Sequence, residues 1–329
     1  MKALTNINAR SIADAVAAAS AAAASGRVFA FSGGGTDLLQ QIKDGTNQAD
    51  VIINLRTVRE ARTVSVSPTE TRIGGLITLT ELAGHAALSA PLAVLREAAA
   101  SVGTPQIRNV ATLAGNVTQR PWCWYYRNGF PCFKAGGTQC FSVHGENQQH
   151  AIFGGGPSFI VHPSDLAPAL VALHATFEVT GPGGPRRMAA ADFFVLPSQD
   201  PARENALVAT ELLTGVRIPT PAAGVISTYL KITDRAAWTH AEVSVAVVLH
   251  VEGDRIRTAS VVLGGGVAPI PWRLTDVEHF LRGTSLSAAV AGQAGALTIA
   301  NAQPLAKNGH KVPMTSAAVE RALMHLAPA

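Results

Sequence analysis

The stretch Arg27-Val-Phe-Ala-Phe-Ser-Gly-Gly-Gly-Thr-Asp37 decides the fold of the N-terminal part of this chain. Its apolar beginning is typical of a short buried strand, and its glycines predict a turn or loop directly after that strand. Asp37–Lys43 then has the pattern of a helix, and Asp50–Leu55 that of a second apolar strand. Upstream, Ser11 can cap an alanine-rich helix. This order of elements predicts a small α/β unit over residues 1–55.

The glycine loop has the chemistry of an anion site as well as that of a turn. Its members are Ser32, Gly33, Gly34, Gly35, Thr36 and Asp37. Glycine lets successive backbone N–H groups converge on one anion, and the start of the following helix adds partial positive charge. A phosphate group is the natural ligand, although a run of glycines fits a tight turn equally well. The run matches neither G-x-G-x-x-G nor G-x-x-x-x-G-K-[ST], so neither a Rossmann site nor a P-loop is predicted.

A second segment of small residues, Thr112-Leu-Ala-Gly-Asn116, offers a hydroxyl and an amide. By itself it indicates little. Together with the glycine loop, in a chain without another phosphate motif, it suggests two loops that grip one diphosphate from two sides.

The rest of the chain divides into a second unit over residues 56–220 and a third over residues 221–329. In the second unit, Thr78-Leu-Thr-Glu81 fits a capping box and therefore predicts the start of a helix. The segment 104–116 shows no clear periodicity, so we expect a loop. Phe159–Val161 is predicted as a strand, and the following Leu166–Ala175 as either a helix or a strand.

The third unit is predicted to be a C-terminal α+β domain, with a sheet that carries helices on one face. Glu252-Gly-Asp254 is predicted to form a hairpin turn between two of its strands. The expected strands are Ser227–Ile232, Ser244–Val251 and Arg257–Leu263, and the expected helices cover about 273–282, 286–300 and 315–326.

Composition excludes several classes of protein. The 329 residues are 47% apolar and 15% charged, with a net charge of +4, which is typical of a globular chain with much buried surface. No Lys/Arg block suggests a nucleic-acid partner. No apolar run is long enough for a membrane span, and no signal sequence is recognisable, so the chain is cytoplasmic in character. Three cysteines do not suggest a disulfide framework.

Five motifs, taken in chain order, resemble the FAD-binding medium subunit of the xanthine dehydrogenase and carbon monoxide dehydrogenase family. The resemblance extends over nearly the whole chain, and the ordered set is far more specific than any single member. The motifs are Ser32–Leu39, Ile107–Asn116, His162–Leu170, Gly264–Pro269 and Lys307–Pro313. The resemblance implies an α+β fold of the molybdopterin dehydrogenase flavoprotein type, in which two subdomains clasp FAD and a C-terminal α+β domain follows.

The same resemblance implies roles for individual residues. The glycine loop and Thr112, Ala114, Gly115 and Asn116 would contact the diphosphate and ribityl chain. Asp165 and Leu166 would border the flavin, and Lys231 and Lys311 would lie near the isoalloxazine, where a cation stabilises reduced, anionic flavin. Each lysine has the alternative of being a solvated surface residue. The residues expected near the adenine-side cleft are Asn54, Leu55 and Ile73–Gly75.

The implied function is electron transfer within a larger enzyme. A large molybdenum-cofactor subunit would oxidise the substrate, a small subunit would carry two [2Fe–2S] clusters, and FAD would pass electrons to an external acceptor. This chain has neither a plant-type cluster motif nor room for a molybdenum domain. If a partner carries an export signal, the complex would be periplasmic. Two alternatives are a stand-alone FAD-dependent oxidoreductase with its own substrate and a flavin-free scaffold protein.

Cys123, Cys132 and Cys140 cluster in an insert at about residues 119–156 that is rich in aromatic and small residues. The insert resembles that of the aldehyde-oxidising branch of the family, whose flavin subunit carries an extra [4Fe–4S] cluster. Such a cluster normally takes four thiolates, and this chain has three. Related sequences would place a cysteine at or near Thr118 or Ser158. The sequence therefore leaves two hypotheses open: a cluster with a non-cysteine fourth ligand, and no cluster.

Overall fold

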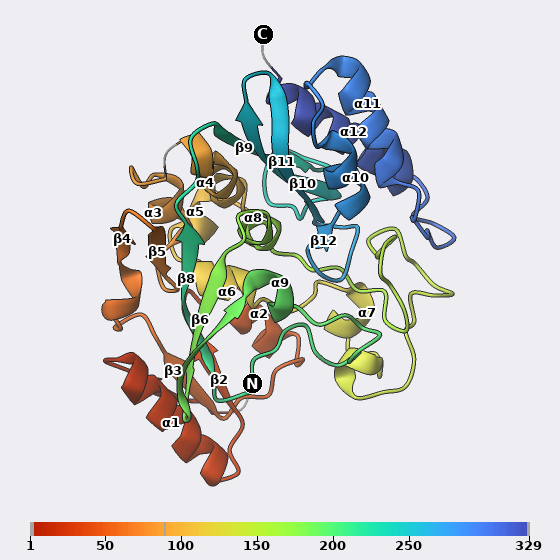
Figure 1. The fold of residues 1–329 in the computed structure, drawn as a ribbon. Helices are drawn as coiled ribbons and strands as arrows, with labels where there is room; N and C mark the ends of the chain where they lie inside the picture. Colours follow the sequence, from red (N-terminus) through yellow and green to blue (C-terminus); the bar gives the residue numbers. More distant parts are fainter. Residues whose placement is uncertain (1–2, 89, 328–329) are drawn as a thin grey trace.

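The computed structural model describes residues 3–88 and 90–327 and contains, over these ranges, three sheets. Figure 1 shows a small N-terminal unit at the bottom, a middle unit, and a C-terminal unit at the top with its helices on the outer side. The irregular insert with its short helix α7 lies to the right of the middle unit. This arrangement is the mixed helix and strand fold that the sequence predicts.

The N-terminal unit is a three-stranded parallel sheet with strand order β1-β3-β2. Ser11 caps α1 by accepting from the Asp14 N–H, as its sequence predicts, and α1 packs on β2 and β3. The first strand was not predicted, because Thr-Asn-Ile-Asn is polar and its pairing comes only from β3. The elements are β1 (Thr5–Asn8), α1 (Ile12–Ala24), β2 (Phe29–Ser32), α2 (Leu38–Lys43) and β3 (Val51–Asn54).

The middle unit is built on a five-stranded antiparallel sheet with the order β4-β5-β8-β6-β7. Its central strand β8 comes last in sequence. The predicted capping box is present, since Thr78 accepts from Glu81 N–H and the Glu81 side chain bonds back to the Thr78 N–H. The strands are β4 (Val64–Val66), β5 (Glu70–Gly74), β6 (Thr176–Gly181), β7 (Gly184–Ala189) and β8 (Leu212–Pro219), and the helices include α3 (Leu79–Ala83), α4 (Ala93–Ala100), α8 (Leu166–Ala172) and α9 (Ala190–Phe193).

Two predictions for the middle unit are wrong. The segment 104–116 is not a plain loop, because it contains α5 (Pro105–Arg108) and α6 (Leu113–Val117), each begun by a threonine cap. These helices are too short to show a 3.6-residue period in the sequence. Phe159–Val161 forms no strand. Its backbone is fixed instead by bonds such as Ala151 N–H to Phe159 O, which no local pattern reveals.

The C-terminal unit is a four-stranded antiparallel sheet with the order β12-β11-β10-β9. The helices α10 and α12 pack against it, and α11 packs on α12, close to the predicted ranges. The other face is covered by α4 and α8 of the middle unit, so both faces of β10 are buried. The elements are β9 (Val225–Ile232), β10 (Val243–Glu252), β11 (Arg255–Gly264), β12 (Trp272–Arg273), α10 (Thr275–Leu281), α11 (Ala288–Thr298) and α12 (Lys311–His325).

The insert is ordered mainly by side-chain bonds rather than by regular structure. It contains only α7 (Trp124–Arg127) and a single 3₁₀ turn (Phe133–Ala135). It leaves the middle unit after α6 and runs along the N-terminal and C-terminal units before returning at α8. The insert therefore contacts all three units, which its sequence does not predict.

Candidate cofactor-binding cleft

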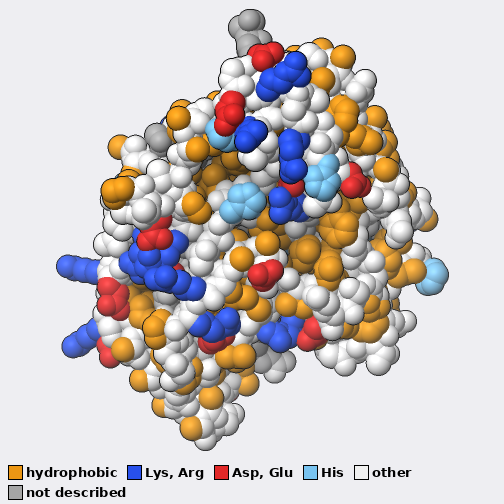
Figure 2. Space-filling view, viewed as in Figure 1, with side chains coloured by type: hydrophobic (Ala, Val, Ile, Leu, Met, Phe, Trp, Pro, Cys, Tyr) orange, Lys and Arg blue, Asp and Glu red, His pale blue; other side chains and the backbone are white. Residues whose placement is uncertain are grey.

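A cleft of about 870 Å³ lies where the three units meet. Its volume is within the range of small-molecule sites in proteins, about 300–1,000 Å³. The N-terminal unit contributes the glycine loop, the middle unit contributes the start of α6 and the segment before α8, and the C-terminal unit contributes a loop after β9. On the face shown in Figure 2, Lys and Arg side chains are scattered among Asp and Glu side chains, so that face presents no continuous basic stripe.

The glycine loop lines the cleft over its full length, from Ser32 to Asp37. It runs from the end of β2 into α2, as the sequence predicts. A Cβ atom added to Gly34 would lie 2.0 Å from the carbonyl oxygen of Val110, and one added to Gly33 would lie 2.7 Å from Thr112 Oγ1. The glycines are therefore required by the close approach of two chain segments, since the backbone at Val110 cannot yield easily.

The second segment begins α6 and faces the glycine loop. Thr112 caps this helix by accepting from the Gly115 N–H at 3.2 Å. Thr112, Gly115 and Asn116 line the cleft, whereas Ala114 does not, and its N–H donates to Gly75 O. The structure thus brings together two segments that are about 80 residues apart in sequence, with one exception among the predicted members.

Asn116 also connects this segment to the region before α8. Its side-chain oxygen accepts from Ser164 Oγ at 2.6 Å and from the Leu166 N–H at 3.3 Å. Leu166 itself is fully buried behind the wall of the cleft and does not line it. The role of Leu166 at the flavin stays a prediction of the family resemblance.

Asp165 lines the cleft and is held by two side chains from β9. Tyr229 Oη donates to one carboxylate oxygen at 2.6 Å, and Lys231 Nζ donates to the other at 2.8 Å. Burial, with the neighbouring carboxylate, raises the pKa of Tyr229 well above its usual value. Lys231 does not line the cleft, but it is paired with Asp165, which does.

Lys311 is neither in the cleft nor on the surface. Its side chain is 0% exposed, and Nζ donates to Gly266 O at 2.7 Å and to His150 O at 3.3 Å. Burial lowers the pKa of Lys311 to about 8, an effect that Glu242 at 3.9 Å partly opposes. The structure therefore gives this lysine a place between the insert and the C-terminal unit.

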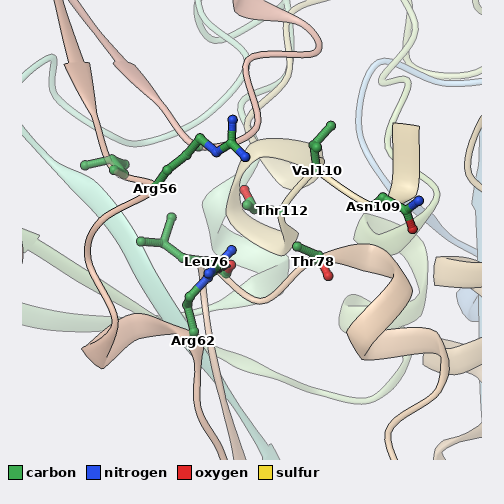
Figure 3. Close-up of a pocket in the computed structure, with 9 residues that line it drawn as sticks. Arg56, Arg62, Leu76, Thr78, Asn109, Val110 and Thr112 are labelled. Atoms are coloured by element: carbon green, nitrogen blue, oxygen red, sulfur yellow. Dashed lines mark hydrogen bonds between the residues drawn. The ribbon is translucent and has the colours of Figure 1, made fainter. Parts of the chain in front are cut away.

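The residues expected near adenine, Asn54, Leu55 and Ile73–Gly75, do not line the main cleft. Leu55 instead borders a second cavity of about 30 Å³ behind the glycine loop. In Figure 3, Arg56 extends toward the segment that carries Val110 and Thr112. This space, about 30 Å³ against about 870 Å³, is far smaller than the main cleft.

Sequence reasoning missed the aromatic rim of the cleft. Trp122 of the insert and His240 of the C-terminal unit line it with their rings 5.3 Å apart. Trp238 lines it as well, is 66% exposed, and has a φ of 55°, which side-chain-bearing residues rarely adopt. No sequence signal places these rings together, because they come from segments more than 100 residues apart.

The cysteines are all free thiols and do not form a metal-binding set. Cys123 Sγ lies 3.3 Å from His150 Nε2, and Cys140 Sγ lies 3.1 Å from Ser142 Oγ. Burial raises the pKa of Cys123 to about 11. Over residues 3–88 and 90–327, no three or more His, Cys, Asp or Glu side chains are grouped to hold a metal ion.

The two positions considered for a fourth cluster ligand do not complete the set. Thr118 lines the cleft and its hydroxyl donates to Ala114 O at 2.8 Å, while Ser158 is buried. The donor set of the insert therefore does not fit a [4Fe–4S] cluster as it stands.

Over residues 3–88 and 90–327, no helix has the length and apolar character needed to cross a membrane.

Two family models of known proteins match successive parts of this chain. A family model described as the FAD binding domain in molybdopterin dehydrogenase matches residues 3–221, and one described as the CO dehydrogenase flavoprotein C-terminal domain matches residues 228–324.

Among curated proteins, the aldehyde oxidoreductase FAD-binding subunit PaoB of Escherichia coli is 35% identical over 75% of this chain and 77% of its own length. The carbon monoxide dehydrogenase medium chain of Afipia carboxidovorans is 28% identical over 90% of this chain and 85% of its own. Among solved structures, a chain of the Cu,Mo-CO dehydrogenase in its cyanide-inactivated form superposes with a TM-score of 0.76 and 25% identity, over 98% of this chain and 97% of the other.

Proposed function

Because this chain belongs to the family of FAD-binding medium subunits of the xanthine dehydrogenase and carbon monoxide dehydrogenase type, we propose that its central cleft is the FAD site. The observation that carries this assignment is the convergence of the glycine loop, the start of α6 and Asp165 on one cleft. Two segments from different units face each other there, as a two-sided grip on a diphosphate requires.

The residues of the cleft divide into two groups. At the glycine loop, backbone N–H groups and the Thr112 hydroxyl would bind the diphosphate oxygens. Asp165, whose charge is balanced by Lys231, would border the flavin. This balance matters because an unpaired carboxylate would oppose the anionic reduced flavin. When bound, FAD supplies the redox chemistry, and the protein orients it and sets its electrostatic surroundings.

The proposed role is electron transfer inside a multi-subunit oxidoreductase. The relatives are named as FAD subunits or medium chains, which implies further chains in their complexes. We propose that this chain assembles with a large molybdenum-cofactor subunit, where the organic substrate is oxidised, and a small [2Fe–2S] subunit. Electrons would reach this subunit from the clusters and leave it for an external acceptor. No general acid or base of this chain is needed for substrate oxidation.

A visible spectrum of the purified chain, followed by co-purification from its native cell, tests the proposal. We expect bound FAD at one per chain and two co-purifying partners, one with molybdenum and one with iron. A colourless chain would point to the scaffold alternative. Bound FAD with no partner, together with oxidation of an organic substrate by the isolated chain, would favour the stand-alone oxidoreductase.

The additional [4Fe–4S] cluster has no role in this proposal, because the donor set around Cys123, Cys132 and Cys140 does not fit it. It stays a prediction of the family resemblance alone. Iron and sulfide analysis of anaerobically purified protein decides the point. Stoichiometric flavin without iron would contradict the prediction of a cluster, and about four irons per chain would support it.

The place of the complex in the cell is a separate proposal. We propose a cytoplasmic location, with the periplasm as the alternative if a partner carries an export signal. Fractionation of cells, with this chain followed by antibody, distinguishes the two. Recovery with periplasmic markers would contradict the first.

A further inference from the structure

We propose that the insert, residues 119–156, is a brace that holds the glycine loop against the rest of the cleft, and that Arg127 is its positioning residue. This inference rests on the proposed FAD site and adds a function for the insert that does not depend on a metal cluster. The supporting observation is a chain of buried charged contacts that joins the insert to two walls of the cleft.

Arg127 makes the contact with the N-terminal unit. Its side chain is 7% exposed, and Nη2 donates to Asp37 Oδ1 at 2.7 Å. Nε donates to Pro121 O at 2.9 Å, and the guanidinium lies 4.4 Å from the centre of the Trp122 ring. The arginine is therefore fixed within the insert while it binds a residue of another unit. A planar, multiply bonded guanidinium is suited to such a position, where a lysine would be only a point charge.

Asp37 is the residue through which this contact reaches the cofactor site. It ends the glycine loop and lines the cleft. Its second oxygen, Oδ2, accepts from the backbone N–H of Arg120 at 2.9 Å and from Gln41 Nε2 at 2.7 Å. Two of its partners thus come from the insert, and the loop cannot move without breaking them.

The other end of the brace is attached to the middle unit. Glu204, which is 4% exposed, pairs with Arg120 at 3.0 Å and with Lys134 at 2.8 Å. Lys134 also donates to Arg203 O at 2.8 Å. The next residue, Asn205, lines the cleft. The insert therefore connects the wall that contains Asp37 with the wall that contains Asn205.

The physical consequence falls on cofactor binding as well as on folding. Removing one partner of a buried ion pair destabilises the fold, because the other charge is left unpaired, and the intact pair defines one geometry. A loop held in its binding geometry binds more tightly, since less conformational freedom is lost with the ligand. Removing Arg127 would also leave the Asp37 carboxylate with less compensation beside an anionic diphosphate.

The test measures the FAD dissociation constant of the full-length chain, stripped of flavin and titrated by fluorescence, with Arg127→Gln. We expect the constant to rise at least 10-fold. The matched control is Arg257→Gln, because Arg257 is 68% exposed and pairs only loosely with Glu252 at 3.8 Å. The control should stay within 2-fold of the parent chain.

A second variant, Asp37→Asn, and the double variant measure whether the two residues act together. If the contact positions the loop, the dissociation constant of the double variant should be about equal to the larger of the two single-variant constants. If the two residues act independently, the fold increases of the two single variants should multiply in the double variant. If Arg127→Gln folds poorly, Asp37→Asn by itself tests the contact, because it removes the carboxylate charge and keeps the arginine. A dissociation constant within 2-fold of that of the parent chain would then overturn the brace.

The outcomes separate this inference from the FAD site on which it depends. A parent chain that binds no FAD would contradict the proposed function. A parent chain that binds FAD, with Arg127→Gln binding it equally well, would overturn only the brace. A lower melting temperature of the flavin-free variant at an unchanged dissociation constant would likewise overturn it, because the contact would then be purely structural.

Discussion

Gly34 lies where two chain segments approach too closely for any side chain. A valine there would place its Cβ 2.0 Å from Val110 O, so the glycine loop and the start of α6 would have to separate. We expect the amount of FAD bound per chain, measured after gel filtration, to be at least 10-fold lower in Gly34→Val than in the parent chain. The control is Gly183→Ala, whose added Cβ would meet nothing within 4 Å. Retention of stoichiometric FAD by Gly34→Val would contradict the assignment of the loop.

Lys311 predicts a pH dependence of stability. Burial lowers the pKa of Lys311 to about 8 in the folded protein from its ordinary value of 10.5. Between these two values the unfolded chain binds more protons than the folded one, so the free energy of unfolding should rise as pH increases from about 8 to about 10.5. The rise is on the order of 3 kcal/mol, at about 1.4 kcal/mol for each pKa unit.

Denaturant titrations of the parent chain and of Lys311→Met across that pH range measure this contribution. Only the difference in slope between the two proteins reports on Lys311, because other lysines and tyrosines titrate in the same range. In the variant, the free energy of unfolding should rise less with pH, because the contribution of Lys311 is missing. Parallel pH profiles would show that the folded-state pKa of Lys311 is not lowered.

At the scale of elements, the contact between α11 and α12 shows how glycines in one helix differ. A Cβ added to Gly292 would meet nothing within 4 Å, whereas one added to Gly295 would lie 2.7 Å from Ser316 O of α12. We expect Gly292→Ala to stabilise the protein by about 1 kcal/mol, because alanine favours a helix interior. Gly295→Ala should destabilise it by about 1–3 kcal/mol, because the two helices must separate.

Chemical denaturation of both variants tests this pair. The comparison is internal, since the same substitution is made twice in one helix, three residues apart. Equal effects of the two changes would mean that the approach of α12 at Gly295 is not tight.

The short helices α5 and α6 show the limit of local pattern at this scale. Thr104 and Thr112 begin them as caps, and Pro105 occupies the first turn of α5. These signals are visible in the sequence, but helices of four and five residues cannot be stable by themselves. Their packing on the middle unit decides that they form.

At the scale of the whole molecule, the cleft exists only because three units converge. A ligand that contacts several units stabilises the folded state by RT ln(1 + [L]/Kd), which is about 2.7 kcal/mol at 100 times the dissociation constant. Removal of FAD should therefore lower the melting temperature by several degrees.

Riboflavin is the matched control ligand for this prediction, because it carries the isoalloxazine and ribityl chain without the diphosphate. We expect FAD to restore the melting temperature of the stripped chain and riboflavin to have a much smaller effect at equal concentration. Equal stabilisation by both would show that the glycine loop and α6 do not bind the diphosphate.

The sequence by itself determined the elements with strong local signals. The strand, glycine loop and helix around Ser32–Asp37, the capping box at Thr78 and the hairpin at Glu252–Asp254 follow from turn chemistry, caps and periodicity, which depend on neighbouring residues. The ordered motifs also predicted the family and the FAD-binding function, as the comparisons show.

Only the tertiary structure decided how these elements meet. It paired the polar strand β1 and covered the second face of the C-terminal sheet with α4 and α8. It also placed Trp122 and Trp238 around the cleft and Arg127 against Asp37. It also buried Lys311 away from the cleft that the sequence had suggested for it. The reason is physical: burial and ion pairing depend on which distant segments come into contact, and local sequence does not contain that information.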